Sequence, residues 1–191
     1  MTDEAVLAVS SWSWHAPYYA GEWSALDLPT TAVEAHLHHI EINDFMLPPP
    51  RYSRLRQPLL RLLPGCPPEL WRYSRASLRQ LKTNALAQQV NIIAWTINSD
   101  FAVPALHWPA QWLYLRRGVA AASWLDVPLV RLNLGGTADT PASQDPLIIQ
   151  RLTQFAQRTL AQHPRLALTI ENHWGVSSDP ARHIRLLDGV A

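Results

Sequence analysis

The chain has 191 residues, of which 48% are hydrophobic and 16% are charged, and its net charge at pH 7 is +1. This length and composition are typical of one globular domain with a substantial core, and they exclude a disordered chain. The near-zero charge gives no reason to expect binding to nucleic acid or to an anionic membrane, because both need a basic surface.

Short apolar segments alternate with amphipathic segments along the chain. The apolar segments predict strands, and the last three are rich in β-branched residues, as parallel strands covered on both faces are. The predicted strands cover residues 6–12, 38–45, 90–97, 128–134 and 166–171.

The connecting segments carry apolar residues at helical spacing. Helices are predicted over residues 68–89 and 109–125, and a short helix at best over 29–37. Asp145 and Asp179 each precede a proline, which predicts an N-cap at the start of a helix, and Gly189 predicts a C-cap. The proline-rich stretch 47–68 predicts a long loop.

This alternation predicts an α/β fold. The last three strands begin at residues 90, 128 and 166, an even spacing that favours a (β/α) barrel over an open doubly wound sheet. Gly135 and Gly136 lack the spacing of a dinucleotide fingerprint. Since a full barrel needs eight units and about 250 residues, we expect a single domain over residues 1–191. It would be a partial TIM-type barrel of about five parallel strands, without the C-terminal units.

The sequence gives indications of the compartment. Cys66 is the only cysteine, so no internal disulfide can form and a reducing environment is expected. The N-terminus is acidic where a signal peptide needs basic residues, and no apolar run approaches the length of a membrane span. We expect a soluble cytoplasmic protein.

Polar and aromatic residues collect at the carboxyl ends of the predicted strands, where barrels place their functional sites. Carboxylates and imidazoles suit a divalent cation, and tryptophan faces with amides suit a sugar ring. The residues are Trp12, Trp14, His15, Glu41, Asn43, Asp44, Trp95, Asn98, Asp100, Asn133, Glu171, Asn172, His173 and Trp174.

Three of these residues have alternative explanations. Glu41 alternates with Ile40 and Ile42, so it points into the barrel if the isoleucines face the helices, and an inward carboxylate favours a functional role. Glu171 fits a metal ligand and an ion pair with an arginine of a neighbouring loop equally well. His173 also fits a hydrogen-bonded loop histidine.

The stretches IEINDFML (residues 40–47) and IENHWGVSSDPARHIRLL (residues 170–187) carry a resemblance to a known family. The first resembles the second strand, and the second resembles the fifth strand and following helix, of the sugar phosphate isomerase/epimerase superfamily, the xylose isomerase-like TIM barrels. The likeness covers essentially the whole chain in order and spacing.

The resemblance implies an isomerase or epimerase that uses a divalent metal (Mn, Mg, Co or Zn) and acts on a sugar or sugar phosphate. Glu171 would be a metal ligand and one of two acid/base carboxylates, and the reaction would move a proton between carbons next to a carbonyl. His173 would orient a substrate oxygen, and Glu41 would lie beneath the pocket. The remaining substrate-binding residues are expected to be Asn172, Asn43, Trp14, Trp95 and Trp174.

The family takes its other metal ligands, an Asp, a His and a second Glu, from the sixth to eighth strands, which this sequence lacks. We therefore expect activity only in a longer form or with a complementing chain, and no bound metal or turnover in the isolated chain. The first and fifth strands would be open edges, which predicts a homo-oligomer or a complementing partner.

Two alternatives stay open. The chain can be a non-catalytic remnant of the barrel that binds a sugar or a partner. It can also resemble the zinc-dependent abasic-site endonucleases, which share this barrel and a Glu-Asn at the fifth strand. Those enzymes need histidines at the ends of the second and third strands, and here the third ends in TINSDF.

Overall fold

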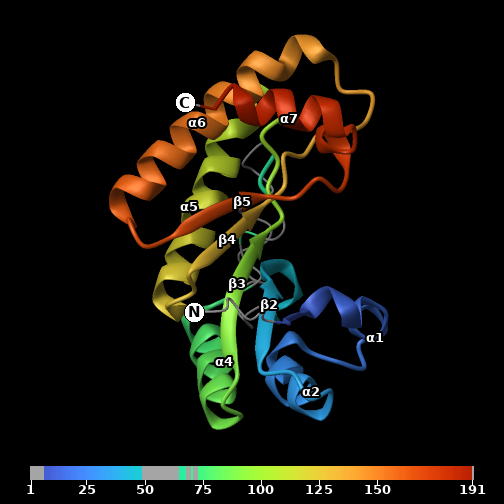
Figure 1. The fold of residues 1–191 in the computed structure, drawn as a ribbon, viewed down its shortest axis with the longest axis vertical. Helices are drawn as coiled ribbons and strands as arrows, with labels where there is room; N and C mark the ends of the chain where they lie inside the picture. The colour runs from blue at the N-terminus through green and yellow to red at the C-terminus, as the bar shows by residue number, and fades with distance from the viewer. Residues whose placement is uncertain (1–6, 49–64, 68–69, 71–72, 191) are drawn as a thin grey trace, which may run out of the picture.

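The computed structural model describes residues 7–48, 65–67, 70 and 73–190. Its centre is a five-stranded parallel sheet in the order β1-β2-β3-β4-β5 (Figure 1). The strands are β1 Val9–Ser10, β2 His39–Asn43, β3 Asn91–Ile97, β4 Leu129–Leu132 and β5 Ala167–Ile170. Each strand pairs with the next one along the chain, as in a barrel, whereas a doubly wound sheet reverses its strand order. The predicted partial barrel of five parallel strands is confirmed.

The helices of the described chain connect these strands. They are α1 His15–Ala20, α2 Leu28–Glu34, α4 Arg75–Ala87, α5 Trp108–Leu125, α6 Asp145–Gln162 and α7 Pro180–Asp188. Of these, α2 packs on β2, α4 packs on β3, and α5 packs on β3 and β4 (Figure 1). None of the described helices combines the length and apolar character needed to cross a membrane.

Local hydrogen bonds explain where the elements differ from expectation. The first strand is short because Ser10 Oγ accepts a hydrogen bond from Trp12 N at 3.3 Å, which turns the chain into a 3-10 helix over Ser11–Trp14. Of the helix expected over residues 68–89, α4 begins at Arg75, after a capping box between Ser74 and Ser77, and residues 68–69 and 71–72 lie outside the described residues. Helix α1 was not expected. Residues 49–64 of the expected loop lie outside the described residues.

The two predicted Asp-Pro helix starts differ in detail. Asp179 caps α7 as expected, accepting a hydrogen bond from Ala181 N at 2.9 Å, and Gly189 is the C-cap. Asp145 is instead the first residue of α6, with Gln144 at the N-cap position. Its Oδ1 lies 2.6 Å from Nη2 of Arg182 on α7, so this carboxylate ties two helices together.

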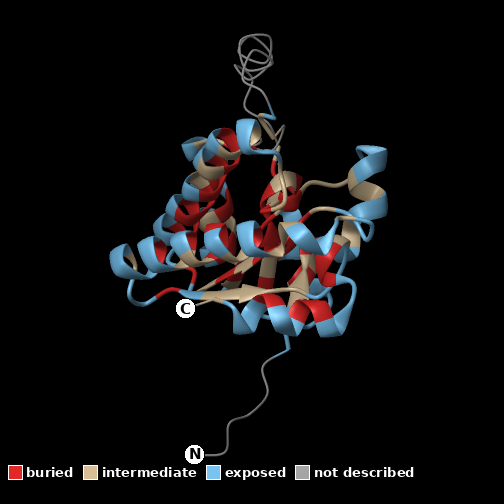
Figure 2. Cartoon of the chain, turned by 90° about the horizontal axis from the view of Figure 1, so that it is seen from above, coloured by how far each residue is buried: buried red, intermediate tan, exposed pale blue. Residues whose placement is uncertain are grey.

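The alternation of side chains gives the sheet two different faces. One face packs on the helices and forms the core, and Figure 2 shows the buried residues gathered between sheet and helices. Its fully buried members include Ile40, Ile42, Trp95, Val130 and Leu132. The opposite face carries the polar side chains of the same strands. The strands β1 and β5 are its edges, and each pairs with a single strand of the described chain.

Candidate functional site

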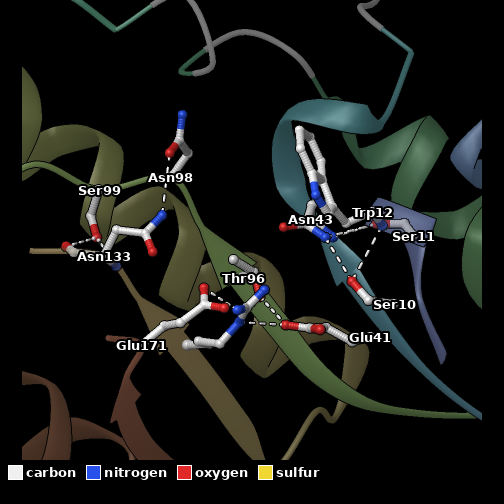
Figure 3. Close-up of polar contacts among 11 residues, drawn as sticks. Ser10, Ser11, Trp12, Glu41, Asn43, Thr96, Asn98, Ser99, Asn133 and Glu171 are labelled. Carbon is white, nitrogen blue, oxygen red and sulfur yellow. Dashed lines mark hydrogen bonds and ion pairs between the residues drawn. The ribbon is translucent and has the colours of Figure 1, made fainter. Parts of the chain in front are cut away.

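Four polar side chains converge on the sheet face that the helices leave uncovered. They are Glu41 on β2, Thr96 on β3, Arg131 on β4 and Glu171 directly after β5. Figure 3 labels Glu41, Thr96 and Glu171. Thr96 and Arg131 are register partners in the sheet. Glu171 N donates to Leu132 O at 3.2 Å, so Glu171 continues the β5 ladder. The sheet itself therefore positions this cluster.

Arg131 links the two carboxylates of the cluster. Its Nε lies 2.6 Å from Glu41 Oε1 and 2.9 Å from Thr96 Oγ1, and its Nη1 forms an ion pair with Glu171 Oε2. Thr96 Oγ1 also donates a hydrogen bond to Glu41 Oε1. Two carboxylates and one guanidinium leave the cluster with one net negative charge.

A layer of amides lies beside this cluster, towards the carboxyl ends of the strands. Asn43 Nδ2 donates to Ser10 Oγ at 3.0 Å and to Ser11 Oγ at 3.1 Å. Asn133 Nδ2 donates to Asn98 Oδ1 at 3.3 Å. Asn133 Oδ1 is buried and has no hydrogen-bond partner among the described residues. Asn43 thus uses both of its side-chain N–H groups, and Asn133 one of its two, within the protein (Figure 3).

These polar residues, with Glu41 just beneath them, form the floor of a pocket of about 380 Å³. Its walls are mostly aromatic, and Trp12 stacks on His15 with ring centroids 4.8 Å apart. The wall residues are Trp12, Tyr18, Tyr19, Phe45, His173 and Trp174. A hollow of about 470 Å³, lined by Pro128 and Leu166, lies instead at the amino ends of β4 and β5. Barrel sites lie at the carboxyl ends, so the first pocket is the candidate.

The structure gathers five of the predicted site residues at this pocket. Glu171, Asn43, His173 and Trp174 line it. Glu41 lies beneath it, bonded to two of the lining residues. Asn172 is exposed and is not part of the lining.

The expected positions of two tryptophans are corrected by the structure. Trp95 is fully buried on the helix-facing side of β3, where its ring meets Tyr73 edge to face at 5.3 Å. It faces away from the pocket because it alternates with Thr96 along the strand. Trp14 stacks on Trp23 with centroids 5.8 Å apart, and Trp12 lines the pocket in its place.

The described residues do not fit a divalent cation. No group of three His, Cys, Asp or Glu side chains in the described part of the chain could hold a metal ion. The expected ligand Glu171 is ion-paired with Arg131, whose positive charge would repel a cation at the same carboxylate. Glu171 alone would leave most coordination positions of Mg²⁺ or Mn²⁺ without a protein ligand.

Sequence reasoning missed Arg131, although a signal was present. Arg131 alternates with Val130 and Leu132, as Glu41 alternates with its two isoleucines. Arg131 therefore lies on the inner face for the same reason as Glu41. The ion-pair alternative for Glu171 placed the arginine on a neighbouring loop, whereas the arginine comes from the neighbouring strand.

The loops at the pocket rim are held together by Asp100 and three glycines. Asp100 Oδ1 accepts hydrogen bonds from Ala102 N at 2.8 Å and from Gly136 N at 3.1 Å, and burial raises the pKa of this carboxyl group. A Cβ on Gly135, whose φ is +80°, would lie 2.1 Å from Asp100 Oδ1. A Cβ on Gly175 would lie 2.1 Å from Gly135 O. These glycines allow three loops to approach one another closely.

No family model and no curated protein sequence matches the chain. Several solved structures do match. The probable 3-DHS dehydratase AsbF of Bacillus anthracis has a TM-score of 0.64 at 14% identity, over 97% of this chain and 59% of that one. D-psicose 3-epimerase, solved in the presence of D-fructose, has a TM-score of 0.62 at 13% identity, over 96% of this chain and 59% of that one.

A xylose isomerase-like TIM barrel protein from Mycobacterium smegmatis, solved in complex with magnesium, also matches. Its TM-score is 0.62 at 11% identity, over 97% of this chain and 61% of that one. The chain thus spans about three-fifths of the length of these proteins. Identities this low bear on the fold alone. Over its five strands, the chain has the fold of the xylose isomerase-like TIM barrels.

Proposed function

We propose that the pocket binds a small polyhydroxylated molecule, and that the chain corresponds to the first five strand–helix units of a sugar isomerase- or epimerase-like barrel. One observation carries the proposal. A pocket at the carboxyl ends of the parallel strands combines aromatic walls with a floor of amides and ion-paired carboxylates. Aromatic faces pack on the C–H groups of a sugar, and amides and carboxylates bind its hydroxyls.

The fold neighbours support this choice of ligand. D-psicose 3-epimerase was solved in the presence of D-fructose and shares this fold, which makes D-fructose a sensible first probe. Two exposed tryptophans that are far apart in the sequence both line the pocket. Trp12 follows β1, and Trp174 follows β5. They can contact a ligand that lies over the polar floor.

Glu171 is the group best placed to take a proton from a carbon next to a carbonyl. Its carboxylate lines the pocket and is 32% exposed at the side chain, so a ligand can reach it. Arg131 fixes the direction of the Glu171 carboxylate through the ion pair. Such a reaction also needs an acid on the opposite side of the substrate, and no described residue of the pocket is assigned that role.

Metal-dependent turnover belongs, in this proposal, to a longer form or to an assembly with a complementing chain. The metal that the resemblance implies would polarise the substrate oxygens. The described residues offer Glu171 and no group of three possible ligands. We therefore expect no isomerase activity from this chain alone.

Calorimetric titration with D-fructose tests the binding proposal. We expect saturable binding that Trp12→Ala weakens about tenfold, because the ring faces the ligand. Trp124→Ala is a matched control, since Trp124 has the same 42% exposure as Trp12 but lies on α5, outside the lining. No saturable binding, or equal losses in the two variants, would contradict the proposal.

Metal analysis of the purified chain tests the proposal that metal-dependent turnover needs a longer form or a complementing chain. After dialysis against Mn²⁺, Mg²⁺, Co²⁺ or Zn²⁺ we expect less than one bound ion per chain, and no conversion of D-fructose. A tightly bound ion at full occupancy, or metal-dependent turnover, would refute this assignment.

A non-catalytic module that binds a partner is the second candidate function. The specific observation is that β1 and β5 each pair with one strand of the described chain. Unpaired backbone groups at a sheet edge favour pairing with a further strand. Light scattering after size-exclusion chromatography should show a dimer or a larger assembly, and a monomer at high concentration would count against this candidate. No described residue cluster favours the zinc-dependent nuclease.

A further inference from the structure

We infer that the pocket selects ligands rich in hydrogen-bond donors and rejects phosphorylated ones, so that its ligand is a neutral polyol or sugar rather than a sugar phosphate. This inference rests on the proposed function. Two independent observations carry it. One is the amide oxygen of Asn133, which has no hydrogen-bond partner among the described residues, and the other is the net charge of the floor.

Two amides of the floor donate within the protein. Asn43 Nδ2 donates to Ser10 and Ser11, and Asn133 Nδ2 donates one hydrogen bond to Asn98 Oδ1. Asn133 Oδ1 is an acceptor without a partner among the described residues.

Of the two amides, Asn133 is the one with a buried oxygen atom that is unpaired within the described part of the chain. Only 8% of the residue is exposed, yet it lines the pocket. A buried acceptor without a hydrogen bond loses about 1–3 kcal/mol, which a donor on the ligand would restore. A hydroxyl can supply that donor, whereas an ionised phosphate has only acceptors to offer.

The charges of the floor point in the same direction. Glu41 and Glu171 carry two negative charges against the single positive charge of Arg131. The Nε and Nη1 groups of Arg131 already face these carboxylates. Among the described lining residues, the only other titratable group besides the tyrosine hydroxyls is the imidazole of His173.

A phosphate ester would bring about −1.5 to −2 further charges to this floor. Its charge would meet the like charge of Glu171 at close range, which opposes its binding. A hydroxyl in the same place can donate to the carboxylate and accept from the remaining N–H groups of Arg131. The floor therefore favours the unphosphorylated ligand.

The test compares D-fructose with D-fructose 6-phosphate by calorimetry on the same protein. We expect D-fructose to bind at least about tenfold more tightly. Glu41→Gln removes one negative charge, and it should narrow this ratio by improving the binding of the phosphate ester. Asn133→Ala should weaken the binding of D-fructose, because the amide oxygen accepts from a ligand hydroxyl.

Asn91→Ala serves as the control, since Asn91 is exposed at the amino end of β3, away from the pocket. The ratio of the affinities for D-fructose and D-fructose 6-phosphate should be the same in Asn91→Ala as in the parent chain. Circular dichroism and thermal unfolding establish that each variant is folded before it is titrated.

The outcomes separate the inference from the proposed function. If the phosphate ester binds as tightly as D-fructose or more tightly, the inference is overturned and the proposed sugar pocket stands. If neither compound binds, both fall. An unchanged ratio in Glu41→Gln, or an unchanged affinity for D-fructose in Asn133→Ala, also overturns the inference, because the selection would then not come from this floor.

Discussion

Replacing Arg131 by methionine tests whether the ion pairs hold the polar face of the sheet together. Methionine keeps much of the length of the arginine stem and removes the guanidinium. Glu41 and Glu171 would then face each other across β3 and β4 without the positive charge that now lies between them. The substitution should therefore lower the free energy of unfolding.

The structure sets the size of this effect. The side chains of Arg131 and Glu41 are 20% and 18% exposed, and that of Glu171 is 32% exposed. Exposed ion pairs contribute about 0.2–1 kcal/mol, whereas removing one partner of a buried pair costs about 3–5 kcal/mol. At intermediate burial we expect a loss of about 2 kcal/mol. In a chain of this size that lowers the melting temperature by about 4–8 °C.

Urea unfolding at pH 7 measures the loss. Arg165→Met is the control, because Arg165 is an exposed arginine in the turn before β5, outside the pocket. Adding Glu41→Gln to the Arg131→Met variant should recover part of the loss, since one of the two uncompensated charges disappears. If Arg131→Met destabilises the protein no more than Arg165→Met does, the ion pairs do not organise this face.

Three further predictions concern the rim, the buried carboxyl group and the tryptophans. Gly135→Ala should cost more than about 3 kcal/mol in urea unfolding, because its Cβ would lie 2.1 Å from Asp100 Oδ1 at a φ of +80°, and Gly21→Ala, at a φ of +77° with open space, should cost about 1–2 kcal/mol. Burial raises the pKa of Asp100 in the folded protein above its usual 3.8, so the free energy that this carboxyl group contributes to folding falls as pH rises through that range. The stability of Asp100→Asn minus that of the parent chain should therefore be more favourable at pH 7 than at pH 3. Equal differences at the two pH values would refute this. Trp95→Ala should cost about 3–5 kcal/mol in thermal unfolding, whereas Trp174→Ala, at a residue that is 39% exposed, should change stability by less than about 0.5 kcal/mol and weaken D-fructose binding in calorimetry.

Most of the architecture could be predicted from local patterns. The even spacing of the strand starts led to sequential parallel strands, which the observed order β1 to β5 confirms. Alternation within β2 correctly placed Ile40 and Ile42 in the core and Glu41 on the other face. Asp179 was correctly predicted as an N-cap, because an Asp-Pro pair before an amphipathic segment is a local signal.

The differences come from contacts between distant segments. Trp95 lies within the mostly apolar strand β3, so its face depends on the register with β2 and β4, where it pairs with Ile42 and Val130. Asp145 bonds Arg182 on a helix far along the chain, which no local pattern reveals. The partner of Glu171 likewise became visible only when β4 and β5 were side by side.

A crystal structure of the chain grown with D-fructose tests the central claim most directly. The account predicts a sugar in the pocket, between Trp12 and Trp174, with a hydroxyl donating to Asn133 Oδ1 and another within hydrogen-bond distance of Glu171. A sugar bound elsewhere, such as in the hollow at the amino ends of β4 and β5, would contradict it. So would a pocket left without sugar at saturating concentration.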